Sequence, residues 1–136
     1  MAVRMDVVYE GNLHCTLTHA PSGSRIVTDA PTDNRGKGEA FSPTDLLGAS
    51  LGSCMLTTMA IVAQDRGWNM DGATASVVKE MGSVPRRHVA KLTVGITLPK
   101  SLDEHARTVL ERTAHTCPTH TSLGELTKVD LSFRYV

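Results

Sequence analysis

The chain has 136 residues, no net formal charge and 40% hydrophobic residues. Its length suits one core, and we expect a single domain over residues 1–136. The balance of 14 basic and 14 acidic residues argues against nucleic acid or an anionic membrane surface as the main partner. Residues 1–6 form no apolar signal core, and three cysteines without a Cys-x-x-Cys pair do not suggest a secreted disulfide framework. We therefore expect a cytoplasmic protein.

Three short strands are predicted near the N-terminus, over residues 7–9, 13–17 and 25–27. In the second of them, apolar residues alternate with polar ones, which gives the strand one apolar face. Glycine, asparagine, proline and serine form turn signals between the strands. A polar loop with one proline and two glycines follows over residues 29–39.

A long helix is predicted next, from Pro43 to about Arg66. Ser42 is a good N-cap, and proline is favoured at the first helical position. Asp45 stands where the acid of a capping box belongs. Gly67 is suited to the C′ position that ends a helix.

Residues 46–63 of this helix form a stretch without formal charge. The length of this stretch is at the lower limit for a membrane span. Glycine, serine and threonine make the stretch only mildly apolar, and no basic cluster flanks it. We therefore expect no membrane span but a helix buried on nearly every face. One thin sheet cannot cover all these faces, whereas a homodimer that packs two such helices between two sheets would do so.

The second half of the chain is predicted to hold a hairpin, two helices and a last strand. The hairpin strands cover residues 74–78 and 89–97, the helices cover 102–114 and 118–123, and the strand covers 129–135. The order shows no regular alternation of strand and helix. It predicts an α+β domain with antiparallel sheet.

Two cysteines in unlike settings carry the main functional signal. Cys54 lies in the middle of the long helix, and Cys117 immediately precedes Pro118 at the start of a short one. They are 117 − 54 = 63 residues apart, so only the fold can bring them together. A thiol inside an apolar helix and a thiol at a helix start suggest a peroxidatic and resolving pair.

Each cysteine also has an ordinary structural interpretation. Cys54 could be a small buried hydrophobic residue, since a reactive thiolate in mid-helix needs a nearby cation. The arginines in or beside loops are candidates, and the sequence does not choose among Arg25, Arg35, Arg86 and Arg87.

Cys117 has the stronger local argument for a reactive thiol. The proline after it places Cys117 at an N-cap, where free N–H groups favour a thiolate. The alternative is a tolerated N-cap without chemistry. Cys15 faces the apolar side of a strand and is interpreted as structural.

Two further patterns resemble a metal site and a hydrolase motif, but neither fits its surroundings. His115, Cys117 and His120 could join Cys54 in a Cys₂His₂ set, but the spacing fits no standard zinc pattern, and we expect no metal. Residues 48–52 match Gly-x-Ser-x-Gly, but that motif needs a strand before a strained turn. Here it lies inside a helix, and we expect its small residues to let another helix pack closely.

Both cysteine segments resemble the OsmC/Ohr family, the osmotically inducible and organic hydroperoxide resistance proteins. Residues 42–54 are similar to the helix that carries the family's first cysteine, and Cys117-Pro118 followed by Leu123 is similar to its second Cys-Pro motif. Residues 84–87 resemble a segment of less characterised OsmC-like members. The resemblance covers nearly the whole chain. It implies an OsmC-like fold, with antiparallel sheets wrapped around long central helices in an intertwined homodimer, and no bound cofactor.

The resemblance also implies a thiol-dependent peroxidase for organic hydroperoxides, with active sites at the dimer interface. Cys54 would form a sulfenic acid, and Cys117 of the same chain would resolve it as a disulfide. This requires the two Cα atoms to lie within about 7 Å. The reductant would be a dithiol, which is of the lipoyl type in the best-known branch.

The sequence departs from the family pattern around the first cysteine. Thr44 stands at the position of a glutamate in the peroxidases, and no clear counterpart of their arginine occurs near the first turn. Asp45 with Arg25 or Arg35 could replace that ion pair. Asp45 is about 14 Å from Cys54 along a straight helix, so it would serve the partner's site or require a kink. The alternative function is a non-catalytic OsmC-like protein that binds a small apolar or thiol-reactive ligand at the dimer interface.

Overall fold

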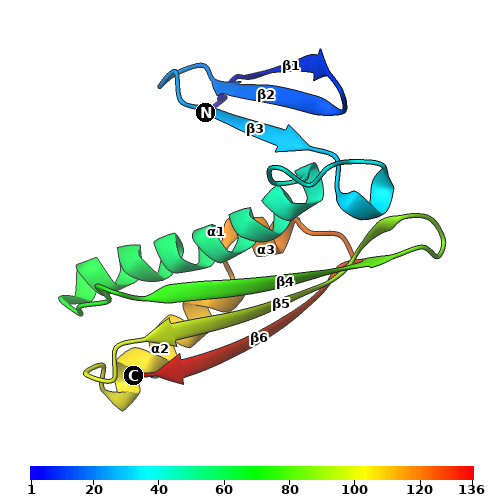
Figure 1. Cartoon of the computed structure of the whole chain (residues 1–136). Helices are drawn as coiled ribbons and strands as arrows, with labels where there is room; N and C mark the ends of the chain where they lie inside the picture. Colours follow the sequence, from blue (N-terminus) through cyan, green and yellow to red (C-terminus); the bar gives the residue numbers. More distant parts are fainter. The chain divides into compact units, whose positions relative to one another are not determined.

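The computed structural model describes all 136 residues as two compact units, Met1–Leu47 and Gly48–Val136. Figure 1 labels the elements of both. The first unit holds a three-stranded antiparallel sheet in the order β1-β2-β3. Its elements are β1 (Met5–Gly11), β2 (His14–His19), β3 (Arg25–Asp29) and the 3₁₀ helix η1 (Thr32–Asn34). The three predicted strands are confirmed, and the single domain stays a prediction.

The first unit buries no apolar side chain within one chain. Its buried residues are the polar Thr28, Asp29 and Ser42. Ten large apolar residues are instead exposed: Met1, Val3, Met5, Val7, Val8, Tyr9, Leu13, Ile26, Val27 and Phe41. Exposed apolar surface of this extent is unusual for a chain that acts alone.

The helix α1 runs over Pro43–Arg66, as the sequence predicts. At its start, the Ser42 hydroxyl accepts the Asp45 N–H at 3.0 Å, and the Asp45 carboxylate accepts the Ser42 N–H at 2.9 Å. This reciprocal pair is the predicted capping box. At its end, Gly67 has a φ of +72°, and the Trp68 N–H donates to the Ala63 carbonyl at 2.8 Å. This Schellman geometry satisfies the last carbonyl groups of the helix.

The second unit contains a sheet in the order β4-β5-β6 and two further helices. Strands β4 and β5 pair antiparallel, but β5 and β6 pair parallel, so the expectation of purely antiparallel sheet is wrong here. Both helices lie between β5 and β6 in the chain and return it to the end where β5 began. The elements are β4 (Thr74–Gly82), β5 (His88–Leu98), α2 (Glu104–His115), α3 (Pro118–Ser122) and β6 (Lys128–Tyr135).

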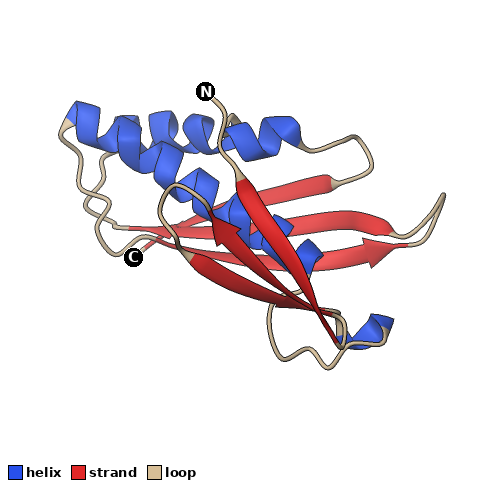
Figure 2. Ribbon diagram, turned by 90° about the horizontal axis from the view of Figure 1, so that it is seen from above, coloured by secondary structure: helices blue, strands red, loops and turns tan.

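One face of this second sheet carries the core. The register places Val77 beside Val94 and Ile96 beside Phe133, so their side chains share a face. Helices α1 and α2 cover this face (Figure 2). The buried apolar residues are Leu51, Met55, Met59 and Ala63 of α1, Met70, Val89, Leu92, Val94, Ile96 and Leu98 on or near the strands, Leu102, Ala106, Leu110 and Ala114 on or before α2, and Cys117.

Two glycines of α1 allow the helix to approach the sheet closely. A Cβ atom at Gly52 would lie 2.9 Å from a methyl group of Val77, and one at Gly48 would lie 3.3 Å from Leu92. The expectation that these small residues face another helix is therefore wrong, because they face β4 and β5. The interpretation that the Gly-x-Ser-x-Gly pattern lies inside a continuous helix is confirmed.

By length and composition alone, α1 passes the test for a membrane span, with a mean hydropathy of 1.8 over 18 residues. Core helices of soluble proteins pass the same test, so the finding is weak evidence for a span. Only 33% of that window is buried within one chain. Ile61, for example, is 56% exposed on the side away from the buried stripe.

Candidate active site: the Cys54 and Cys117 pair

The core packing of α1 positions Cys54. Its neighbours Leu51 and Met55 are fully buried against the sheet, which fixes the rotation of this helical turn. Cys54 itself is half-buried at the edge of that stripe. One turn further along α1, the Thr58 hydroxyl lies 3.9 Å from the Cys54 sulfur.

The start of α3 positions Cys117. Cys117 is the N-cap of this helix, as predicted, with Pro118 at the first helical position. Its sulfur accepts the His120 N–H at 3.4 Å, and its carbonyl accepts the Thr121 N–H at 3.0 Å. The side chain is 0% exposed. Cys117 is therefore held by both its backbone and its sulfur.

The fold brings the two cysteines together although 63 residues separate them. The two thiols lie close enough for each to shift the pKa of the other. Thr119, two residues after Cys117 on α3, lowers the pKa of Cys54 through its hydroxyl and its peptide group. The resulting cluster consists of two thiols and two threonine hydroxyls from α1 and α3.

The pKa values of the two thiols are shifted in opposite directions. Burial raises the pKa of Cys54, but hydrogen bonds from Thr119, Cys117 and Thr58 outweigh it, so the pKa lies below the ordinary value of 9.0. Burial raises the pKa of Cys117 above 9.0, and the neighbouring Cys54 sulfur raises it further. Cys54 is thus the thiol that ionises first. The expectation from the helix start alone favoured Cys117, and burial reverses it.

The predicted supporting residues all lie in the first unit. Arg25 is an exposed residue of β3, and Arg35 is exposed after η1 with a φ of +69°. Asp45 is engaged in the capping box of α1. No observation tests a role for these three residues at Cys54, so their roles stay predictions.

The remaining candidates from the sequence have separate environments. Cys15 is a half-buried free thiol on β2, opposite Tyr9 and Thr28. His115 makes an edge contact with Phe133, at 6.3 Å between ring centroids. No group of three or more histidine, cysteine or acidic side chains is arranged to hold a metal ion. Arg86 and Arg87 are exposed in the β4–β5 connection.

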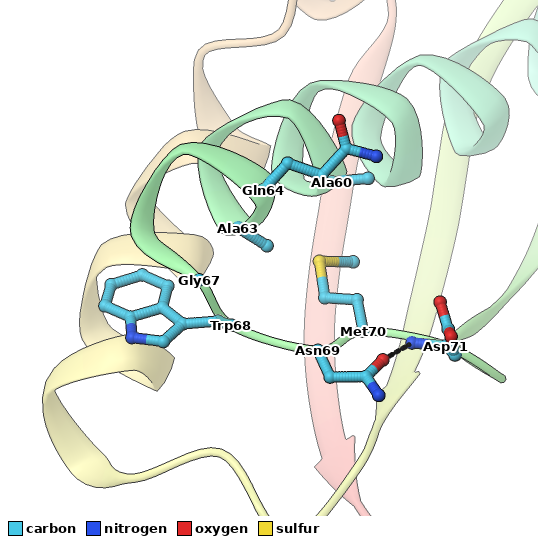
Figure 3. A pocket seen from close by; sticks show the side chains of 8 residues that line it. All are labelled: Ala60, Ala63, Gln64, Gly67, Trp68, Asn69, Met70 and Asp71. Carbon is cyan, nitrogen blue, oxygen red and sulfur yellow. Dashed lines mark hydrogen bonds between the residues drawn. The ribbon is translucent and has the colours of Figure 1, made fainter.

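An open pocket of about 330 Å³ lies at the C-terminal end of α1 (Figure 3). It is lined by Ala60, Ala63, Gln64, Gly67, Trp68, Asn69, Met70 and Asp71. The Asn69 side chain accepts the Asp71 N–H at 2.7 Å and thereby shapes its rim. Neither cysteine lines this pocket, so we do not assign it to the thiol chemistry.

Comparison with known protein families matches residues 36–132 to the family described as OsmC-like protein. The chain belongs to the OsmC-like protein family. The matched segment contains both cysteines and both helices that carry them. A comparison with curated proteins found no match.

Solved structures of OsmC-like proteins share the whole fold. A Psychrobacter arcticus protein, provisionally described as an osmotic stress induced and detoxification response protein, is 42% identical, with a TM-score of 0.90 over 96% of this chain and 94% of that one. An organic hydroperoxide resistance protein OsmC from Legionella pneumophila is 15% identical, with a TM-score of 0.78 over 98% and 97%. One from Elizabethkingia anophelis is 14% identical, with a TM-score of 0.79 over 100% and 97%. The last two establish likeness of fold alone.

Proposed function

We propose that this OsmC-like protein is a cytoplasmic thiol-dependent peroxidase that reduces organic hydroperoxides. The observation that carries the proposal is that Cys54 and Cys117 shift each other's pKa, with the Cys54 pKa lowered and the Cys117 pKa raised. The names of the hydroperoxide resistance proteins that share the fold support the substrate class. Because Cys54 has the lower pKa, we assign it as the attacking thiol and Cys117 as the resolving thiol.

In the first step, the Cys54 thiolate attacks one peroxide oxygen of ROOH. A sulfur–oxygen bond forms, the O–O bond breaks, and the alkoxide takes a proton to leave as the alcohol. Cys54 is thereby oxidised to the sulfenic acid.

In the second step, the Cys117 thiolate attacks the sulfenic sulfur. A disulfide forms, and hydroxide leaves and is protonated to water. Oxidation of Cys54 removes the negative charge that helped to raise the Cys117 pKa, so Cys117 ionises more readily after the first step than before it. A dithiol of the lipoyl type then reduces the disulfide and is itself oxidised to a disulfide.

We further propose that the working form is a homodimer. Ten large apolar residues of the first unit are exposed in one chain, and α1 carries no charge from Leu46 to Ala63. A second copy would cover both surfaces and thereby bury apolar area. An arginine from the partner, such as Arg25 or Arg35, would then add to the stabilisation of the thiolate.

The test is turnover with defined substrates and reductants. Cumene hydroperoxide and hydrogen peroxide are compared, each with dihydrolipoamide and with a monothiol as the reductant. We expect the fastest turnover with cumene hydroperoxide and the dithiol, and unchanged turnover in Cys15→Ser. No peroxide loss above the rate of the reductant alone would overturn the proposal.

A non-catalytic OsmC-like protein that binds a small apolar or thiol-reactive ligand is the second candidate. It is favoured by Thr44, which occupies the position of a glutamate in the peroxidases. Free thiols counted before and after one equivalent of cumene hydroperoxide distinguish the two. A binding protein keeps its three thiols, whereas the peroxidase loses two.

A further inference from the structure

The pocket at the C-terminal end of α1 continues past Met70 into a second depression. The first has a volume of about 330 Å³ and the second of about 270 Å³, and both are lined by Ala60, Met70 and Asp71. Met70 is only 9% exposed and points from the loop toward α1, so its side chain forms a shared floor (Figure 3). The two depressions together form one groove, of a size that suits a small organic molecule.

The loop that forms one wall of the groove is held in a single conformation by its own hydrogen bonds. The Asn69 side chain accepts the Asp71 N–H at 2.7 Å, which is the dashed line in Figure 3. The Ala73 N–H donates to the Met70 carbonyl at 2.9 Å and closes a turn in which Gly72 has a φ of +87°. Such a preformed wall can bind a ligand without first having to be ordered.

The two ends of the groove differ in chemistry. Trp68 and Asp71 lie on opposite sides of Met70 (Figure 3). The indole ring of Trp68 makes an edge contact with His105 at 5.9 Å between centroids, and the Arg66 guanidinium lies 5.6 Å from the Trp68 ring. Asp71 is exposed and is the only ionisable residue that lines either depression. The groove therefore offers an aromatic ring at one end and a negative charge at the other.

We propose that this groove binds a small organic cation with an aromatic body, of the arylalkylamine class, with its ring beside Trp68 and its ammonium group at Asp71. The lining supplies one carboxylate and no basic side chain, so charge complementarity favours a cation over an anion. Arg66 lies at the Trp68 end and therefore directs the ammonium group to the other end. The apolar lining, which includes Ala60 and Met70, suits the hydrocarbon part of the ligand.

The single tryptophan of the chain makes this binding directly measurable. Trp68 emission is followed while the full-length protein is titrated with phenethylamine, with the neutral 2-phenylethanol and with the anionic 3-phenylpropionate. We expect a saturable change with phenethylamine, binding of 2-phenylethanol that is about fivefold weaker, and no saturable change with the anion. No peroxide is present, so the outcome is independent of the proposed peroxidase activity.

Asp71→Asn removes the charge and keeps the size of the side chain. It should weaken the binding of phenethylamine about fivefold and leave that of 2-phenylethanol unchanged. Asp65→Asn is the matched control, because Asp65 is an exposed acid near the end of α1 that lines neither depression, and it should leave both affinities unchanged.

Three results would each overturn the proposal. Equal binding of the amine and the alcohol by the wild type would show that charge does not select the ligand. Equal losses in the two asparagine variants would show that the effect of Asp71 is not local. No saturable response to phenethylamine would show that the groove takes no such ligand, as expected if a second copy of the chain covers it.

Discussion

At the residue scale, the two cysteines differ because their neighbours differ. Cys54 gains hydrogen-bond donors, whereas Cys117 is fully buried beside a sulfur that becomes negative. The position of a cysteine at a helix N-terminus favours its thiolate, but that effect is smaller here than burial. The proposed assignment of Cys54 as the attacking thiol therefore rests on its tertiary environment and not on local helix geometry.

This assignment predicts different behaviour for two serine variants. Cys117→Ser should consume one equivalent of cumene hydroperoxide and hold a sulfenic acid at Cys54, because no thiol remains to resolve it. Cys54→Ser should react at least about tenfold more slowly, since the buried Cys117 has a raised pKa. Dimedone labelling with peptide mapping measures both. Rapid reaction of Cys54→Ser, with an inert Cys117→Ser, would reverse the two roles.

Tyr135 provides a second prediction, on stability in alkali. Burial and the nearby Glu111 carboxylate raise the pKa of Tyr135 to about 12. The folded state therefore holds this proton more tightly than the unfolded state, whose tyrosine pKa is 10.0. The stabilisation is complete below pH 10.0 and is lost as the pH rises through about 12.

Tyr135→Phe should remove this pH-dependent loss, which we expect to be on the order of 1–2 kcal/mol. Urea unfolding at a series of alkaline pH values measures it. Tyr9→Phe, at a 63% exposed tyrosine, is the control and should keep the wild-type slope. Equal slopes in wild type and Tyr135→Phe would show that burial does not hold the phenol proton.

The sequence predicted some residues of the site and missed others. Cys54 and Cys117 stand out because thiols are rare and their helical settings can be recognised locally. Thr119 and Thr58 could not be found this way, because threonine is common and the effect of Thr119 on the Cys54 pKa depends on how α1 and α3 pack. Asp45 was recognised as a capping residue from its spacing to Ser42, and that local geometry is confirmed.

At the element scale, the start and end of α1 were predictable because capping is local chemistry. The direction of β6 was not, because strand pairing depends on where a long connection returns the chain. Residues 99–127, which include α2 and α3, form that connection. A crossover of this length allows parallel pairing, and β6 adopts it beside β5.

The close approach of α1 to the sheet predicts an unusual response to alanine. Alanine in place of a helical glycine normally stabilises by about 1 kcal/mol. Gly52→Ala should lose that gain or destabilise, because its Cβ would lie 2.9 Å from the stiff side chain of Val77. In a Val77→Ala background the same substitution should stabilise. Urea unfolding of the four proteins measures the coupling, and simple additivity would contradict this packing.

At the scale of the whole molecule, the exposed apolar surface predicts association. The wild type should sediment as a homodimer at micromolar concentration. Ile61→Asp places a charge on the uncharged outer side of α1, where Ile61 is 56% exposed, and should shift the equilibrium toward monomer. Val84→Asp alters an 83% exposed residue of the β4–β5 connection and should not. A compact wild-type monomer at this concentration would refute the homodimer.

The disulfide between Cys54 and Cys117 is tested most directly by peptide mapping of the wild-type protein after one equivalent of cumene hydroperoxide. We predict that two of the three thiols disappear, that Cys54 and Cys117 of the same chain are joined, and that Cys15 stays free. A mixed experiment with isotopically labelled protein establishes that the link lies within one chain. A disulfide that contains Cys15, or three free thiols after the treatment, would contradict it.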